Sequence, residues 1–296
     1  MVSSAIALEA TGNVNTESPQ RRPVQVLAVT GGKGGVGKSN VTINLAIELG
    51  KLGRKVLVLD ADLGLANIDV LCGIKPQGTL ADVLRGELSL DEIVVQIDDH
   101  VSLLPASSGA SRVASMTQVE YGGLIQAFSS MQAPIDILIV DTPAGISNQV
   151  TAFCRAAREV VVVVCDEPTS VSDACSTIEV LNKEFQVKRF NILVNKVSSS
   201  DRALDLFDSV VERADQQVED ERSEVVLSYL GAIPQDKNLH IGACEQSPVV
   251  KSFPASGASI AFKKLAKKIH GWPEPHQPIG HVEFFVERLV MQGVTE

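Results

Sequence analysis

The chain lacks the features that mark secreted, membrane-spanning or cluster-binding proteins. Among its 296 residues are five cysteines at scattered spacings with no Cys-x-x-Cys pair, so neither a disulfide framework nor a zinc or iron–sulfur site is expected. No run approaches the roughly 18 uncharged residues of a membrane span, and the N-terminus lacks the pattern of a signal peptide. We therefore expect a cytoplasmic protein with buried thiols at Cys72, Cys154, Cys165, Cys175 and Cys244.

The balance of charge is acidic. Asp and Glu number 36 against 26 Lys and Arg, which gives a formal net charge of −10. Such a surface repels nucleic-acid phosphates, so direct DNA binding is not expected as a general role, although a local basic patch is compatible with this balance. With 45% hydrophobic and 21% charged residues, the chain has enough apolar material for one large α/β domain or two small ones.

Short apolar runs rich in β-branched residues alternate with amphipathic segments, which favours one domain over residues 23–270. Because the runs are nearly continuous, we expect strands that are covered by helices on both faces. The fold class is therefore α/β, with a single doubly wound, mostly parallel sheet that carries helices on both faces. In such sheets ligands bind beyond the carboxyl ends of the strands. The runs cover 24–30, 55–60, 101–107, 135–141, 159–166, 190–197 and 225–234.

The two ends of the chain differ from this pattern. Residues 1–22 are polar without apolar periodicity, so we expect a disordered N-terminal arm. Residues 271–280, GWPEPHQPIG, are expected to form a stiff tether because of their prolines. In the last segment, 281–296, Val282, Phe285, Val286, Leu289 and Val290 share one helical face, which predicts an amphipathic helix and a tail. This helix either docks in a groove of its own domain or lies on a membrane, and a nucleotide-gated switch between the two states reconciles both. It lacks the basic face that attracts anionic lipid.

The stretch GGKGGVGKS at residues 31–39 fits the phosphate-binding pattern G-x-x-x-x-G-K-[ST], with Gly32, Gly37, Lys38 and Ser39 in the specified places. A loop around phosphates must point its N–H groups inward at close approach, which glycine allows. Lys38 can then reach the β- and γ-phosphates, and the Ser39 hydroxyl can bind Mg²⁺. An apolar run precedes the stretch and a helical pattern follows it, as the motif requires.

An extra lysine, Lys33, opens the loop, and K-G-G-x-G-K-[ST] from Lys33 to Ser39 resembles the deviant Walker A motif of MinD- and ParA-type ATPases. The resemblance implies slow Mg²⁺-dependent ATP hydrolysis and an ATP-gated homodimer. In that family the early lysine contacts the nucleotide of the partner subunit, so Lys33 and Lys38 are both implied as catalytic residues. The implied ATP/ADP contacts in the loop are Gly32, Lys33, Gly34, Gly35, Val36, Gly37, Lys38, Ser39 and Asn40.

Residues 57–69, LVLDADLGLANID, resemble the first switch region of MinD-type proteins. Carried over by position, Asp62 orients the attacking water, and Asp60 supports Mg²⁺ through its water shell. Asn67 lies in the same loop. A lone Asp-x-Asp would ordinarily indicate an exposed turn, but its place shortly after a P-loop favours the switch.

Residues 135–145, IDILIVDTPAG, have the form of a Walker B strand that enters the second switch. The aspartate at the end of the apolar run, Asp141, is placed to meet Mg²⁺ through water. Gly145 is the candidate γ-phosphate sensor. The predicted metal-side residues are therefore Ser39, Asp60 and Asp141.

Two later segments resemble the adenine side of the family's site. In VNKV (194–197), the Asn195 amide can both donate to and accept from a purine edge. In GAIPQD, Pro234 and Asp236 occupy the loop that lies against the base. A guanine-specific protein would carry Asn-Lys-x-Asp, whereas Ser198 stands in the last place here, so ATP and ADP are the favoured cofactors together with Mg²⁺.

Within the MinD-like group, residues 23–291 resemble most the flagellar number regulators of the FlhG and FleN group, through CDEPTS after the fifth run and GHVEFFVERLV near the end. The resemblance implies a switch that controls flagellar number by restraining the enhancer-binding activator of flagellar genes. It also implies work beside an FlhF-type GTPase and reversible, polar attachment to the inner face of the membrane. The helix that stimulates this GTPase in some members has no counterpart in residues 1–22. Asp173, in the segment after the fifth run, is a candidate contact to the other subunit or to a partner, or else a helix cap or a residue of a solvated face.

The alternative is a ParA-type DNA-segregation or MinD-type division-positioning ATPase. A DNA-binding member would need a basic surface, and FKKLAKKI (262–269) supplies four lysines. A helix with Leu265 and Ile269 inward and its lysines outward is, however, more often simply solvated.

Overall fold

The computed structural model describes residues 24–62, 68–105, 127–128, 131, 134–217 and 225–273, without the side chain of Leu84. The expected N-terminal arm, Asn67, most of the tether and the terminal helix lie outside these residues. Within the described part of the chain, no helix is both long and apolar enough to cross a membrane.

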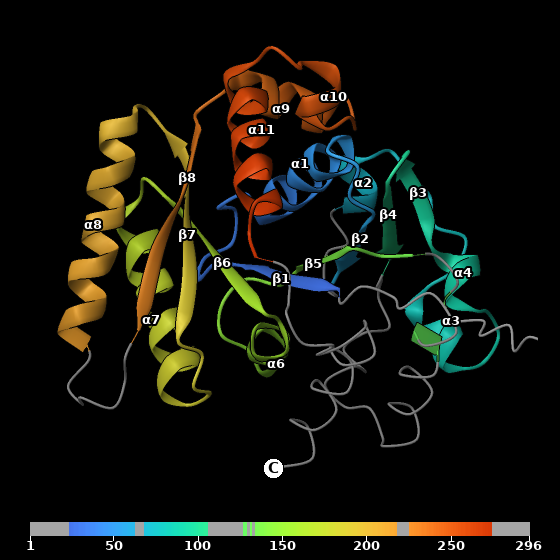
Figure 1. Cartoon of the computed structure of the whole chain (residues 1–296), viewed down its shortest axis with the longest axis horizontal. Coiled ribbons are helices and arrows are strands. Elements are labelled where there is room, and N and C mark those ends of the chain that lie inside the picture. Colours follow the sequence, from blue (N-terminus) through green and yellow to red (C-terminus); the bar gives the residue numbers. More distant parts are fainter. Residues whose placement is uncertain are drawn as a thin grey trace, which may run out of the picture.

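A single eight-stranded sheet forms the centre of the molecule, in the order β3-β4-β2-β5-β1-β6-β7-β8 (Figure 1). All neighbouring strands are parallel except β3, which runs antiparallel to β4. The predicted doubly wound, mostly parallel sheet is therefore confirmed. The strands are β1 (Gln25–Thr30), β2 (Val56–Asp60), β3 (Val95–Asp98), β4 (Val101–Pro105), β5 (Ile137–Asp141), β6 (Glu159–Cys165), β7 (Arg189–Val197) and β8 (Val226–Pro234).

Helices cover both faces of the sheet because alternate side chains of each strand point to opposite sides. In β1, Leu27 and Val29 pack with residues of α1 and α11, whereas Ala28 packs on the other face with residues of α6, α7 and α8. Figure 1 shows α1 and α11 on one side of the sheet and α6 on the other. The helices are α1 (Lys38–Lys51), α2 (Ile68–Leu71), α3 (Leu80–Leu84), α4 (Leu90–Ile93), α6 (Asn148–Ala156), α7 (Pro168–Lys183), α8 (Ser200–Gln217), α9 (Lys237–Cys244), α10 (Val249–Ser252) and α11 (Gly257–His270).

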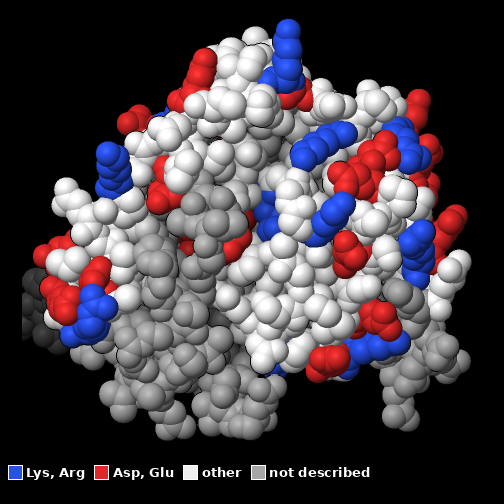
Figure 2. All heavy atoms as spheres, turned by 180° about the vertical axis from the view of Figure 1, so that it is seen from behind, with Lys and Arg blue, Asp and Glu red and all other residues white. Residues whose placement is uncertain are grey.

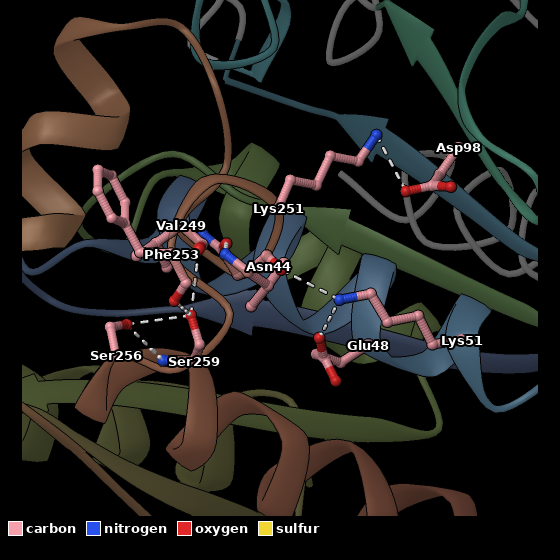
Figure 3. A network of polar contacts seen from close by, with 10 residues as sticks. Asn44, Glu48, Lys51, Asp98, Val249, Lys251, Phe253, Ser256 and Ser259 are labelled. Atoms are coloured by element: carbon pink, nitrogen blue, oxygen red, sulfur yellow. Dashed lines mark hydrogen bonds and ion pairs between the residues drawn. The ribbon is translucent and has the colours of Figure 1, made fainter.

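A polar network ties α10 to α1, the helix that follows the glycine-rich loop (Figure 3). The fully buried Asn44 accepts a hydrogen bond from the Val250 amide at 3.1 Å and donates to the carbonyl of Asn40 at 2.8 Å. Lys51 donates to the Val250 carbonyl at 3.1 Å, and Lys251 pairs with Asp98 on β3 at 2.9 Å. The segment after β8 is therefore held against the middle and the C-terminal end of α1.

Candidate functional site: a phosphate-binding loop and its cavity

The glycine-rich loop joins β1 to α1 in the conformation that its sequence predicts. Gly35 and Gly37 have φ values of 80° and 98°, in the left-handed region that favours glycine. A Cβ added to Gly34 or Gly35 would meet no atom within 4 Å, so the backbone there borders open space, while Val36 is buried in the core and anchors the loop. The loop therefore presents bare backbone where a phosphate group would approach.

Helix α7 packs directly on the start of this loop. A Cβ on Gly32 would lie 2.2 Å from the carbonyl carbon and oxygen of Asp173, so only glycine fits there. Asp173 lies in the interior of α7, whose N-cap is Glu167. The alternative that Asp173 caps a helix is therefore wrong, and its role as a partner contact stays a prediction.

A cavity of about 890 Å³ opens beside the loop. Predicted site residues form much of its wall: Gly34, Gly35, Gly37, Lys38, Ser39, Asn40, Asp62, Asn195, Pro234 and Asp236. The wall also contains residues that the sequence did not single out: Val70, Leu71, Ala144, Lys196, Gln235, Leu239, His240 and Ala243. The spacing of Leu239, His240 and Ala243 on the helix after Pro234 could have indicated a helical wall.

The two predicted metal-side carboxylates are cross-strand neighbours, because Asp60 on β2 is in register with Asp141 on β5. Asp141 is fully buried, and its Oδ1 accepts a hydrogen bond from the Thr42 hydroxyl at 3.2 Å. Burial raises the pKa of Asp141 to about 7, and the charge of Asp60 adds to this, although hydrogen bonds from the Ser39 and Thr42 hydroxyls oppose it. The carboxyl therefore sits close to a change of protonation near neutral pH.

The oxygen donors at this point fit a magnesium ion. Oδ2 of Asp141 is buried without a hydrogen-bond partner, and an orphaned carboxylate oxygen calls for a cation or a metal-bound water. The Ser39 hydroxyl also acts on this carboxyl, since it opposes the rise in the pKa of Asp141. Hydroxyl and carboxylate oxygens are the ligands that Mg²⁺ prefers. Asp60 also has a structural role, since its two oxygens accept from the amides of Asp62 and Ile68, each at 3.2 Å.

The two lysines of the loop differ in their surroundings: Lys38 lines the cavity, and Lys33 lies against α7. Lys38 is 7% exposed and lines the cavity, and burial lowers its pKa while the charges of Asp141 and Asp62 oppose that shift. Lys33 instead forms an ion pair with Glu167 at the start of α7 and donates to the Thr169 hydroxyl at 3.0 Å. The structure thus brings Lys38, Asp62 and Asp141 together and holds Lys33 apart from them.

The polar groups that were predicted to contact the base and the γ-phosphate form hydrogen bonds within the protein in this structure. The Asn195 amide donates to the Val36 carbonyl at 2.8 Å, and the carboxylate of Asp236 accepts from the amides of Asn238 and Ala258, each at 2.9 Å. The Gly145 amide lies 3.3 Å from the Gly31 carbonyl, and Ala144 stands in the cavity wall beside it. Contacts of these three residues with a nucleotide stay predictions.

Comparison with known proteins gives the family. A family model described as ParA, NUBPL iron-transfer P-loop NTPase, matches residues 23–270. The chain belongs to the ParA family. This ParA-family chain is 47% identical over 273 residues to the antiactivator FleN of Pseudomonas aeruginosa. The match covers 92% of this chain and 96% of FleN. It is 34% identical over 240 residues to the flagellum site-determining protein YlxH of Helicobacter pylori, with 81% of this chain and 80% of YlxH covered.

Solved structures of MinD share the fold of this ParA-family chain. MinD of Pyrococcus horikoshii, in complex with Mg-ADP, is 27% identical with a TM-score of 0.67 and covers 84% of this chain and 96% of that one. The Aquifex aeolicus MinC:MinD complex matches with 25% identity and a TM-score of 0.66, over 86% of this chain and 99% of that one. The chain is therefore a P-loop ATPase with a MinD-like fold, as the deviant Walker A motif predicted.

Proposed function

We propose that the chain is an ATP-gated dimerisation switch that controls flagellar number or placement. The observation that carries the proposal is the separation of the two loop lysines, because Lys38 lines the cavity while Lys33 lies outside it on Glu167. A loop that needed both lysines for one bound nucleotide would turn both inward. A lysine held at the surface is instead available to a second subunit.

Within one subunit, each residue of the cavity has a distinct task. Lys38 and the loop amides bind the phosphates, and Asp62, at the cavity wall, orients the attacking water. Ser39, Asp60 and Asp141 would hold Mg²⁺, which when bound neutralises charge on the phosphates.

In the dimer, Lys33 exchanges Glu167 for the nucleotide of the partner subunit. The exchange costs little because both side chains of the ion pair are substantially exposed. Two exposed apolar side chains give a second copy something to bury: Val70 in the cavity wall, and Ile146, which follows the wall residue Ala144 by two positions.

The flagellar part of the proposal rests on the relative YlxH, whose name states a flagellar role, and on the resemblance of residues 23–291 to the flagellar number regulators. The word antiactivator in the name of FleN supports a partner that activates transcription, which we assign to the enhancer-binding activator class. An FlhF-type GTPase is a further proposed partner. We also propose that residues 281–296, beyond a tether at 271–280, attach the cytoplasmic protein reversibly to the inner membrane at the cell pole.

Charge argues against the ParA-type alternative of DNA segregation. Figure 2 shows Lys and Arg interspersed with Asp and Glu on the face it presents, without one continuous basic surface. Of the α11 lysines, Lys268 donates to the carbonyls of Tyr229 at 2.6 Å and Leu230 at 3.1 Å, so its charge already has partners. A band shift of duplex DNA in the presence of ATP would favour the alternative.

The experiment that tests the switch is Asp62→Ala, studied by size-exclusion chromatography with light scattering. The variant should bind ATP but not hydrolyse it, so a dimer should accumulate with ATP and not with ADP. The matched control is Asp201→Ala, because Asp201 is exposed on α8 and does not line the cavity. Wild-type turnover of Asp62→Ala, or a monomer with ATP, contradicts the proposal.

A further inference from the structure

Lys196, at the end of β7, has an unusual backbone for a residue with a long side chain. Its φ is 58°, in the left-handed region, and non-glycine residues rarely adopt that conformation without a local reason. It also lines the cavity, and its Nζ donates to the carbonyl of Gly35 at 2.7 Å. The strained residue thus sends its side chain to the phosphate-binding loop.

The preceding residue makes the next contact along the same loop. Asn195 is 3% exposed, and its side-chain nitrogen donates to the carbonyl of Val36 at 2.8 Å. Its oxygen accepts from the amide of Lys196 at 2.9 Å, which steadies the left-handed turn. Two consecutive side chains therefore hold two consecutive carbonyls of the loop.

The geometry of the peptide bond gives these contacts a consequence. In a trans peptide the carbonyl of one residue and the N–H of the next point in opposite directions, and none of the described peptides is cis. When Lys196 draws the Gly35 carbonyl towards β7, the Val36 N–H turns away from β7. When Asn195 draws the Val36 carbonyl, the Gly37 N–H turns away likewise.

We infer that Lys196, with Asn195, is a positioning residue that aims the amides of Val36 and Gly37 at the phosphates of the nucleotide. It acts through the loop and does not read the base. A Cβ on Gly37 would lie 2.5 Å from the Asn195 nitrogen, so the loop and the Asn195 side chain are already in close contact. The inference rests on nucleotide binding, which is part of the proposed function, and is independent of ATP-driven dimerisation.

The test measures the affinity of the full-length chain for Mg-ADP and Mg-GDP by competition with a fluorescent ADP analogue. Lys196→Gly keeps the left-handed backbone and removes the side chain. Loss of one charge-assisted hydrogen bond should weaken both nucleotides by the same factor, about tenfold. Lys196→Arg retains a charged donor and should recover most of the affinity.

The control is Gln186→Gly, because Gln186 is another left-handed non-glycine residue, with a φ of 59°, outside the cavity. It should leave ADP affinity unchanged. An unchanged affinity in Lys196→Gly, or an equal loss in Lys196→Arg, overturns the inference. If wild-type protein fails to bind ADP, the proposed function itself falls.

A second variant separates loop positioning from base reading. Asn195→Asp replaces the donor to the Val36 carbonyl by an acceptor of the same size. A positioning role predicts equal losses for ADP and GDP. If the preference moves towards GDP, whose base offers donors to a carboxylate, Asn195 reads the base and its part of the inference is wrong.

Discussion

At the scale of single residues, the most informative group is the buried carboxyl of Asp141. Without Mg²⁺, its pKa of about 7 lies well above the ordinary value of 3.8. The folded chain therefore binds more protons than the unfolded chain between pH 4 and 7, and the free energy of unfolding falls as pH rises through that range. Above this range the penalty stays constant.

Asp141→Asn should remove this part of the pH dependence. Since one pKa unit corresponds to about 1.4 kcal/mol, we expect the variant to be more stable than the wild type by a few kcal/mol at pH 8. The measurement is urea unfolding in EDTA without nucleotide at pH 5 and pH 8. Asp201→Asn, on the exposed face of α8, should follow the wild type at both pH values. The expectation is contradicted if the wild type gains stability relative to Asp141→Asn between pH 5 and pH 8.

The ion pair between Lys33 and Glu167 gives a second prediction for single residues. Glu167→Gln removes the charge that holds Lys33, so ATP-dependent dimerisation should strengthen. The gain should be at most about fivefold, because exposed ion pairs contribute little to stability. Light scattering over a concentration series with ATP measures it.

The gain should depend on Lys33. Glu167→Gln combined with Lys33→Ala should dimerise no better than Lys33→Ala alone. Glu184→Gln, at the other end of α7, serves as the matched control. Weaker dimerisation in Glu167→Gln would show that Glu167 itself acts in the dimer.

At the scale of helices and strands, the sequence predicted seven of the eight strands because buried parallel strands leave continuous apolar runs. It missed β3, whose residues VQID are only partly buried at the sheet edge. The loop and its following helix were predictable because the motif is local. The position of the Lys33 side chain could not be predicted, because it depends on an ion pair with Glu167, 134 residues away.

The cavity wall formed by α9 was likewise not predictable from the sequence, because it depends on contacts between distant segments. Leu239, His240 and Ala243 border the cavity because α9 lies beside α2 and follows Pro234. No local pattern states which helix will pack there. The Asn195 contact with Val36 likewise joins segments 159 residues apart, so a motif alone could not show that its amide is already used.

The Asn44 network predicts how firmly α10, the helix that follows α9, is attached to α1. Asn44→Ala leaves the buried amide of Val250 without its acceptor, so we expect a loss of about 1–3 kcal/mol in the free energy of unfolding. Urea unfolding measures the loss. Lys51→Ala is the comparison, because the Lys51 side chain is 46% exposed and should matter less. Equal stability of Asn44→Ala and the wild type would show that α10 is held by its apolar contacts alone.

At the scale of the whole molecule, we expect the apolar face of residues 281–296 to bind in one of two places, its own domain or a bilayer. Burial of Phe285 is worth roughly 1.5–3 kcal/mol wherever it occurs, so a modest change on dimerisation can move the segment from the domain to a bilayer. Two segments in a dimer bind by avidity where one binds weakly. Phe285→Glu should therefore lose ATP-dependent binding to anionic liposomes in a flotation assay and keep nucleotide binding.

The control for this prediction is the nucleotide itself. The wild type should float with liposomes in ATP and be released in ADP. A substitution on the polar side, Glu283→Gln, should retain lipid binding. If the wild type with ATP ignores anionic liposomes, the segment is a docking helix and the proposed membrane attachment is wrong.

The two edge strands of the sheet, β8 and β3, decide how readily the protein can aggregate at high local concentration. Among the described strands, β8 pairs only with β7, and an edge strand of this kind can recruit further chains. Leu230 interrupts the β7–β8 ladder, since Tyr229 pairs with Ile192 and Gly231 with Leu193. Lys268 donates hydrogen bonds to the carbonyls of Tyr229 and Leu230. At the opposite margin, β3 has only four residues. Neither margin offers a long template for polymerisation, so a local concentration high enough to populate a dimer need not lead to fibres.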